Sequence, residues 1–168
     1  MSAEQKSAVS RRLSGQKQRL KLMTIFAAAH PLLAEALAKR GFSTMTDVQS
    51  AVLADSCNNQ DLLVSAQTGS GKTVAFGLSM AAQLLGPDAE NDFPSQPAAL
   101  IITPTRELAL QVKTELDWLY AETGLVLASA VGGMDIRTER RALSGRVDIL
   151  IGTPGRLVDH LNRNSFDP

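Results

Sequence analysis

The segment AQTGSGKT, residues 66–73, constrains the fold of this chain more than any other part of the sequence. It follows a short apolar run, DLLVS at residues 61–65, and it leads into a stretch from Lys72 to Leu85 that has the composition of a helix. A short apolar run bounded by turn residues is typical of a buried strand. The segment therefore predicts a glycine-rich turn between a strand and a helix, where the N-terminus of the helix can hold an anion.

The residue types in this turn match a phosphate-binding loop, or P-loop. Its glycines let backbone N–H groups turn inward and approach phosphate oxygens closely. Lys72 supplies a mobile positive charge, and the Thr73 hydroxyl is a ligand for Mg²⁺. The alternative is an ordinary glycine turn, and a P-loop alone does not distinguish kinases, transporters, GTPases and helicases. The residues predicted to surround a bound nucleotide are Ala66, Gln67, Thr68, Gly69, Ser70, Gly71, Lys72 and Thr73.

Apolar runs alternate with helical patterns along the chain. We expect strands at 61–65, 99–103, 125–131 and 147–152, and helices at 26–40, after Thr46, at 72–85, 107–120 and 136–143, and from near Gly155. The segment 86–97 is rich in Pro, Asp, Asn and Ser and is expected to be a surface loop. This alternation predicts an α/β fold with a mostly parallel, doubly wound sheet and helices on both faces.

Composition sets the broad class of the chain. Its 168 residues are enough for one domain with a substantial core. No apolar run approaches the roughly 20 residues that a membrane helix needs, so no membrane partner is expected. The lone cysteine, Cys57, excludes an internal disulfide, and the N-terminus lacks a secretory pattern, which together favour a cytoplasmic protein.

Charge is balanced over the whole chain, with 17 basic and 17 acidic residues, but it is unevenly distributed. Residues 1–22 hold 6 basic residues against Glu4 alone, which leaves 11 basic and 16 acidic residues for the rest. We expect residues 1–22 to be a disordered basic leader and residues 23–168 to form the domain. Contact between this leader and RNA phosphates is the alternative.

The segment GFSTMTDVQ, residues 41–49, resembles the Q motif of DEAD-box helicases, with Met45 in place of the usual proline. The resemblance implies that the Gln49 carboxamide pairs with adenine N6 and N7, which selects ATP over GTP, and that Phe42 lies against the base. Thr46 and Gln49 also have the spacing of a capping box, which needs no ligand. Both interpretations hold if Thr46 caps the helix while Gln49 faces the nucleotide.

Three further segments each follow an expected strand. PTRELALQ at 104–111 matches motif Ia of the same family, Gly132–Gly133 its GG element, and TPGR at 153–156 its motif Ib. Taken singly, each segment is also a common turn or helix start. In an open α/β sheet, ligands bind at the carboxyl ends of the strands, where helix N-termini can hold phosphates. The resemblance implies an RNA-backbone site made of Pro104, Thr105, Arg106, Gly132, Gly133, Thr153, Pro154, Gly155 and Arg156.

These elements, in this order, identify the chain as a member of the DEAD-box ATP-dependent RNA helicases. Within that family, the sequence resembles the bacterial DeaD-like branch. The resemblance runs from about Phe26 to the end of the chain. It implies that the chain forms the first RecA-like domain and that ATP and Mg²⁺ are its cofactors. It also implies that RNA and a second RecA-like domain are its partners, and that Lys72 and Thr73 take part in catalysis. A non-catalytic nucleotide- or RNA-binding module and a P-loop enzyme such as a small-molecule kinase are the alternatives.

The family's Asp-Glu-Ala-Asp and Ser-Ala-Thr motifs do not occur in this sequence. The resemblance places their strands inside the sheet, beside or near the P-loop strand. We therefore expect this chain alone to be poorly stable, not to hydrolyse ATP, and to leave an apolar edge unpaired beside residues 61–65.

Other residues receive simpler interpretations. Phe26 is the candidate for the isolated upstream aromatic that is usual in the family. His160 is expected at the surface or at a helix end, and Trp118 is expected to pack against its neighbours. If the chain alone hydrolyses ATP, Asp148 and Asp159 are the candidates to take the role of the absent Asp-Glu-Ala-Asp carboxylates.

Overall fold

The computed structural model describes residues 26–57, 60–86 and 96–166, and its centre is a three-stranded parallel sheet. The strands are β1 (Ala99–Ile102), β2 (Leu127–Ala130) and β3 (Ile149–Gly152), in the order β1-β3-β2. The central strand β3 pairs with both of the others, so that Ile149 lies opposite Ala99 on one side and Leu127 on the other. This sheet confirms the predicted α/β fold.

Helices precede, connect and follow these strands, close to the ranges that the sequence predicts. They are α2 (Pro31–Lys39), α3 (Asp47–Val52), α4 (Lys72–Leu84), α5 (Arg106–Leu119), α6 (Ile136–Leu143), α7 (Pro154–Asn162) and a short 3₁₀ helix, η1 (Asp55–Cys57).

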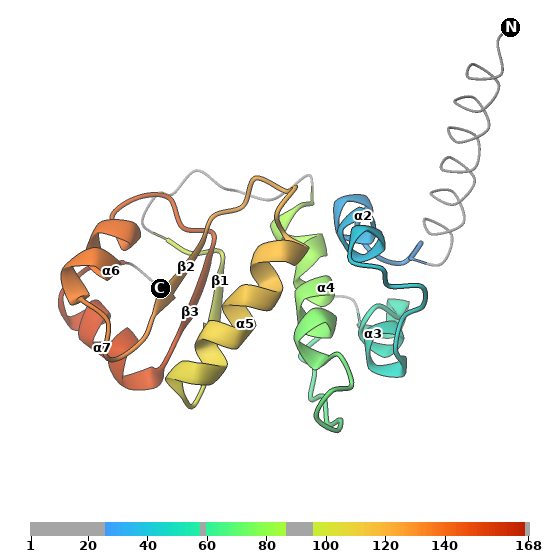
Figure 1. Cartoon of the computed structure of the whole chain (residues 1–168), viewed down its shortest axis with the longest axis horizontal. Coiled ribbons are helices and arrows are strands. Elements are labelled where there is room, and N and C mark those ends of the chain that lie inside the picture. The colour runs from blue at the N-terminus through green and yellow to red at the C-terminus, as the bar shows by residue number, and fades with distance from the viewer. Residues whose placement is uncertain (1–25, 58–59, 87–95, 167–168) are drawn as a thin grey trace, which may run out of the picture.

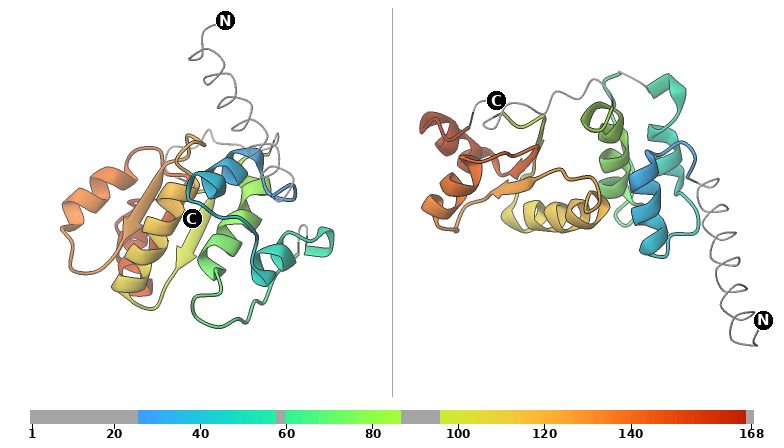
Figure 2. Two further views of the ribbon diagram at one scale, coloured as in Figure 1. Left: turned by 45° about the vertical axis from the view of Figure 1, so that its right-hand side comes forward. Right: turned by 90° about the horizontal axis from the view of Figure 1, so that it is seen from above.

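The central strand is buried on both faces because helices cover both. Ile149 and Ile151 belong to the larger hydrophobic cluster, on the side of α5. Leu150 points the other way and joins Leu143 of α6 and Leu157 of α7 in a second cluster. Figure 1 shows α6 and α7 on one side of the sheet and α5, α4 and α2 on the other, and the turned views in Figure 2 show the same order.

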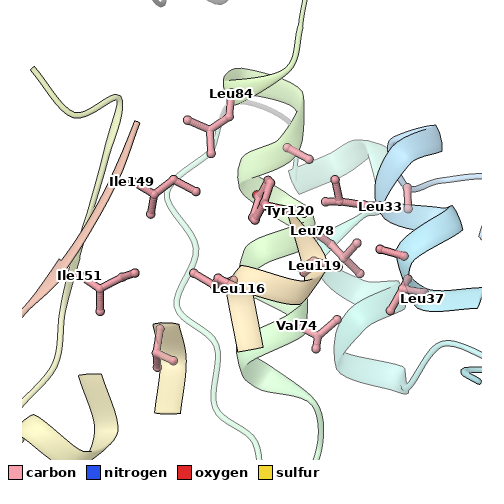
Figure 3. Close-up of a cluster of buried hydrophobic side chains, with 14 of the residues drawn as sticks. Leu33, Leu37, Val74, Leu78, Leu84, Leu116, Leu119, Tyr120, Ile149 and Ile151 are labelled. Atoms are coloured by element: carbon pink, nitrogen blue, oxygen red, sulfur yellow. The ribbon is translucent and has the colours of Figure 1, made fainter. Parts of the chain in front are cut away.

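The larger cluster joins the sheet to three helices. Leu37 of α2, Leu78 of α4 and Leu116 of α5 are all buried within it (Figure 3). Burial of one such side chain contributes about 1.5–3 kcal/mol. Helices α4 and α5 approach closely at Gly77, where an added Cβ would lie 2.7 Å from a Leu119 methyl carbon.

Tyr120 closes the same contact between α4 and α5. Its hydroxyl is buried and donates a hydrogen bond to the Gly77 carbonyl at 2.5 Å. Burial raises the pKa of the Tyr120 hydroxyl, because the apolar surroundings disfavour the phenolate.

Helix α2 begins later than the sequence predicts. The expected helix starts at Phe26, but residues 26–28 form a turn and the helix starts at Pro31. The proline ring disfavours helical geometry at the preceding residue, and His30 is accordingly extended, with φ −56° and ψ 137°. Pro31 itself suits the first turn, because its missing N–H has no partner there in any helix.

The predicted strand at residues 61–65 is wrong in this structure. Residues 61–67 form no ladder with any described strand. The Leu63 side chain is 101% exposed, and Leu62 and Val64 are 41% and 42% exposed. An extended segment becomes a strand only when a neighbour takes up its backbone hydrogen bonds, and the described strands pair only with one another.

The unpaired segment agrees with the expectation of an uncovered apolar edge. A cavity of about 1060 Å³ lies between this segment and α4, and Leu62, Val64, Phe76 and Met80 are among the residues that line it. The partly exposed residues Leu62 and Val64 therefore border this cavity.

Two expectations fall outside the described residues. The basic leader, residues 1–22, lies outside them, as do residues 87–95 of the expected surface loop. Within the part of the chain that the structure describes, no helix has the length and apolar character needed to cross a bilayer.

Candidate nucleotide site and nucleic-acid interface

The P-loop region joins the unpaired segment to α4. Gly69 and Gly71 have φ values of +79° and +82°, in the left-handed region that glycine adopts without strain. Gly71 is the N-cap of α4, so the loop leads directly into the helix N-terminus. The Lys72 ammonium donates to the carbonyls of Ala66 and, at 2.5 Å, of Gln67. The loop is thus wrapped around the lysine, with the positive charge held inside it.

Gln49 links the segment 41–49 to this loop. The Thr46 hydroxyl accepts from the Gln49 N–H at 3.4 Å, and the Gln49 Oε1 accepts from the Thr46 N–H at 3.1 Å, which is a complete capping box. The Gln49 Nε2 also donates to the Gly71 carbonyl at 3.5 Å. The side chain is 0% exposed, so the capping glutamine is packed directly against the P-loop.

The Gln49 carboxamide keeps part of its hydrogen-bonding capacity. A carboxamide has two N–H donors and two acceptor lone pairs. One acceptor position binds the Thr46 N–H and one donor binds the Gly71 carbonyl. One donor and one acceptor position of the carboxamide therefore make no hydrogen bond to Thr46 or Gly71, although the side chain is fully buried in this structure.

The aromatic residues of this region lie differently from what the sequence suggests. Phe26 is 1% exposed and belongs to the hydrophobic core, so its ring is not presented to a base. Phe42 stacks on Trp118, with ring centroids 5.8 Å apart, and Arg40 covers the Trp118 ring at 5.1 Å. Trp118 is therefore a packing residue, as expected, and it occupies one face of Phe42.

A second cavity, of about 660 Å³, lies between α3 and the P-loop. Thr46, Val48, Ala66, Gln67 and Ser70 are among its lining residues. The Ser70 hydroxyl is buried and has no hydrogen-bond partner. A buried polar group without a partner is costly, so an acceptor or donor from a bound group would stabilise this loop.

Three loops meet at the carboxyl edge of the sheet, and the loop at residues 131–134, named here the GG loop, makes hydrogen bonds with the other two. The Arg106 Nη1, at the start of α5, donates to the Gly132 carbonyl at 3.1 Å. The Arg156 Nη2, in α7, donates to the Met134 carbonyl at 2.5 Å. Gly133 has a φ of +81°, in the left-handed region that favours glycine, and an added Cβ would also displace the Arg106 guanidinium.

Threonines begin the helices that flank the GG loop. Thr105 is the N-cap of α5, and its hydroxyl accepts from the Leu108 N–H at 3.3 Å. Thr153 is the N-cap of α7 and makes no capping hydrogen bond with its side chain. Pro104, Pro154 and Gly155 are exposed beside them. The predicted RNA-binding residues of all three segments therefore share one edge of the sheet.

Two polar residues whose burial the sequence analysis did not predict lie beneath this edge. Glu139 of α6 is 3% exposed, and His160 of α7 is 0% exposed. His160 lies in the last turn of α7, at a helix end as expected, but it is not at the surface: its Nε2 lies 2.8 Å from the Glu139 Oε2 inside the protein. Glu139 has the same helical spacing as the apolar Ile136 and Leu143, and this pattern could have placed it on the inner face of α6.

Asp148 and Asp159 are already engaged elsewhere. Asp148 precedes β3, at the sheet edge opposite the three loops, and accepts from the Val126 N–H at 2.7 Å and from the Arg146 Nε at 3.0 Å. Asp159 accepts from the Arg163 Nε at 2.9 Å, and this hydrogen bond holds the pKa of its carboxyl below the usual range. Among residues 26–57, 60–86 and 96–166, no group of three or more His, Cys, Asp or Glu side chains is placed to hold a metal ion.

Comparison with known proteins agrees with this geometry. The family model described as DEAD/DEAH box helicase matches residues 46–167. The ATP-dependent RNA helicases RhlB of Serratia proteamaculans and Cronobacter sakazakii are 43% and 44% identical over 141 and 138 residues, which is 83% and 82% of this chain and 33% of each relative.

Solved structures resemble the fold as well. The RNA helicase Prp28 from Chaetomium thermophilum bound to ADP matches with a TM-score of 0.73 and 32% identity over 83% of this chain and 34% of its own. A DEAD box protein from Methanococcus jannaschii matches with a TM-score of 0.69 and 33% identity over 83% of this chain and 36% of its own.

The chain belongs to the DEAD/DEAH box helicase family, and its fold is that of a RecA-like helicase domain. It spans about a third of the length of the curated relatives it matches. The assignment to a DeaD-like branch stays a prediction.

The two P-loop glycines provide a matched test of the contact between Gln49 and the loop. Gly69→Ala and Gly71→Ala both place a Cβ at positive φ, which costs roughly 1–2 kcal/mol. At Gly69 the Cβ meets open space, whereas at Gly71 it would lie 2.5 Å from the Gln49 Nε2. We expect Gly71→Ala to lower the free energy of unfolding by about 1 kcal/mol more than Gly69→Ala, because Gln49 must give up its hydrogen bonds. Denaturant unfolding measures this difference, and equal losses would show that Gln49 does not pack against the loop.

Proposed function

We propose that this chain is the ATP-binding and RNA-backbone-binding part of an ATP-dependent RNA helicase that locally unwinds or remodels RNA duplexes. One observation carries the proposal: Arg106 and Arg156 converge on the GG loop at the carboxyl edge of the sheet, in the chain that also holds a P-loop packed against Gln49. Ligands of open α/β sheets bind outside this edge.

The P-loop region fits a nucleoside triphosphate. The first turn of α4 offers backbone N–H groups with no helical partner, and Lys72 adds a full positive charge. The unpartnered Ser70 hydroxyl supplies a further polar group. Residues 66–73 would hold the phosphates, and a Mg²⁺ bound with them would be coordinated by the Thr73 hydroxyl and would neutralise phosphate charge.

Gln49 fits adenine through the donor and acceptor that remain on its carboxamide. Adenine presents the N6 amino group as a donor and N7 as an acceptor, and the guanine base has O6 in place of N6. Phe42 and Thr46 lie in the same segment and would complete this part of the site. The capping box fixes the Gln49 side chain, so little conformational entropy is lost when the base binds.

The edge of the sheet fits a phosphate backbone. Residues 104–106, 132–133 and 153–156 supply helix N-termini, the Thr105 and Thr153 hydroxyls and two arginines. Such contacts position a nucleic acid without reading its sequence. A second RecA-like domain would complete the RNA site and the catalytic site, which fits a chain that spans a third of its relatives. RhlB and Prp28, by their names, are themselves RNA helicases.

RNA-dependent ATP hydrolysis by the complete protein tests the proposed function. We expect hydrolysis to rise when single-stranded RNA is added, and Lys72→Ala to abolish it, because the charge that neutralises the phosphates is lost. Lys113→Ala is the matched control, because this lysine pairs with Asp117 on α5, away from both sites. A rate of hydrolysis that does not change when RNA is added, or transfer of phosphate to a small molecule, would favour a P-loop enzyme outside the helicases.

Two substitutions at Gln49 separate its capping role from base recognition. Gln49→Glu keeps an oxygen for the Thr46 N–H, whereas Gln49→Ala removes the capping interaction as well. We expect both variants to lose the preference for ATP over GTP by roughly 1–3 kcal/mol. Only the alanine variant loses the cap, about 1 kcal/mol, whereas the glutamate variant keeps the cap but places a carboxylate oxygen opposite the Gly71 carbonyl. Nucleotide titration and thermal unfolding measure the two effects. If the affinities for ATP and GTP fall by the same factor, Gln49 acts only as a capping residue.

A further inference from the structure

The Glu139 carboxylate is buried beneath the GG loop and accepts from three groups. Its Oε1 accepts from the Val131 N–H at 2.9 Å. Its Oε2 lies 2.9 Å from the Arg156 Nε and 2.8 Å from the His160 Nε2. A buried carboxylate is tolerated only with such partners. This residue therefore joins the first residue of the GG loop to α6 and α7.

Arg156 faces inward rather than outward. Its Nε also lies 3.3 Å from the Val131 carbonyl, and its Nη2 donates to the Met134 carbonyl. Its Nη1 lies 3.6 Å from Asp159, and the side chain is only 15% exposed. The guanidinium thus holds both ends of the GG loop, and its position is fixed by the Glu139 carboxylate.

His160 is the third partner of the Glu139 carboxylate. Hydrogen bonding to a carboxylate requires a proton on Nε2, so the neutral ring carries its lone pair on Nδ1. The Nδ1 atom is buried and has no hydrogen-bond partner. Within the described residues, the ring thus makes its one hydrogen bond, with Glu139, through Nε2.

We propose that Glu139 is a positioning residue for RNA binding: it does not touch RNA, but together with Arg156 it holds the GG loop in the shape that presents its backbone to a phosphate. The inference rests on the proposed function and deepens it. It also assigns Arg156 an indirect part, through the loop, where the sequence suggests a direct phosphate contact.

Whether removal of the Glu139 carboxylate weakens or strengthens RNA binding distinguishes a positioning role from a purely electrostatic effect. Removing a negative charge beside an RNA site strengthens binding when only charge matters. The proposal requires the opposite result: Glu139→Ala in the complete protein weakens binding of a short single-stranded RNA about tenfold, the loss expected for one hydrogen bond to a charged group. Glu139→Gln, which keeps an acceptor for the Val131 N–H, weakens it less. Fluorescence anisotropy of labelled RNA measures both.

A double-mutant cycle tests whether Glu139 and Arg156 act as one unit. The variant with both Glu139→Ala and Arg156→Ala is expected to bind RNA no more weakly than the worse single variant, because both changes release the same loop. Arg146→Ala is the matched control, since it removes an exposed arginine that pairs with Asp148 at the opposite edge of the sheet, and it should combine additively with Glu139→Ala.

Measurements of ATP affinity and of amide hydrogen exchange show whether the Glu139 variants are still folded. We expect ATP affinity to stay unchanged in the Glu139 variants, while exchange becomes faster at residues 131–134 and not at residues 66–73. If Glu139→Ala binds RNA as tightly as the natural protein, or if the two substitutions are additive, the inference is wrong. If the natural protein binds no RNA, the proposed function itself fails.

Discussion

The arrangement of the three segments that we propose to bind RNA depends on the parallel pairing of three strands. Because β1, β2 and β3 run in the same direction, their carboxyl ends lie at one edge. The segments after them must therefore meet there, although they are far apart in the sequence. Buried β3 lies between the other two, and apolar residues on both of its faces hold the helices that supply Arg106 and Arg156.

Buried polar side chains then fix the loops that this scaffold brings together. Gln49 ties α3 to the P-loop, and Glu139 ties α6 and α7 to the GG loop. Each is almost fully buried and uses its oxygen atoms to accept backbone N–H groups. The two loops that we propose to bind phosphates are thus each held by hydrogen bonds to a buried side chain.

Local pattern predicted the parts of this structure that local chemistry determines. The capping box at Thr46 and Gln49, the glycines at positive φ and the order of helices and strands all follow from short-range rules. The unpaired segment at 61–65 could not be predicted from its apolar composition, since pairing depends on neighbours distant in the sequence. The helical spacing of Glu139 could have indicated that it faces inward, but its partners could not be predicted, because the Val131 N–H and His160 lie in a loop and in another helix.

The central claim is that the carboxyl edge of the sheet binds an RNA backbone. Photo-crosslinking of a uniform single-stranded RNA to the complete protein, with a non-hydrolysable ATP analogue and mass-spectrometric mapping of the adducts, tests it most directly. The account predicts crosslinks within this domain at residues 103–106, 131–134 and 153–156, the three segments that meet at this edge. Crosslinks on the outer faces of α2 and α3, with none at the three segments, would contradict it.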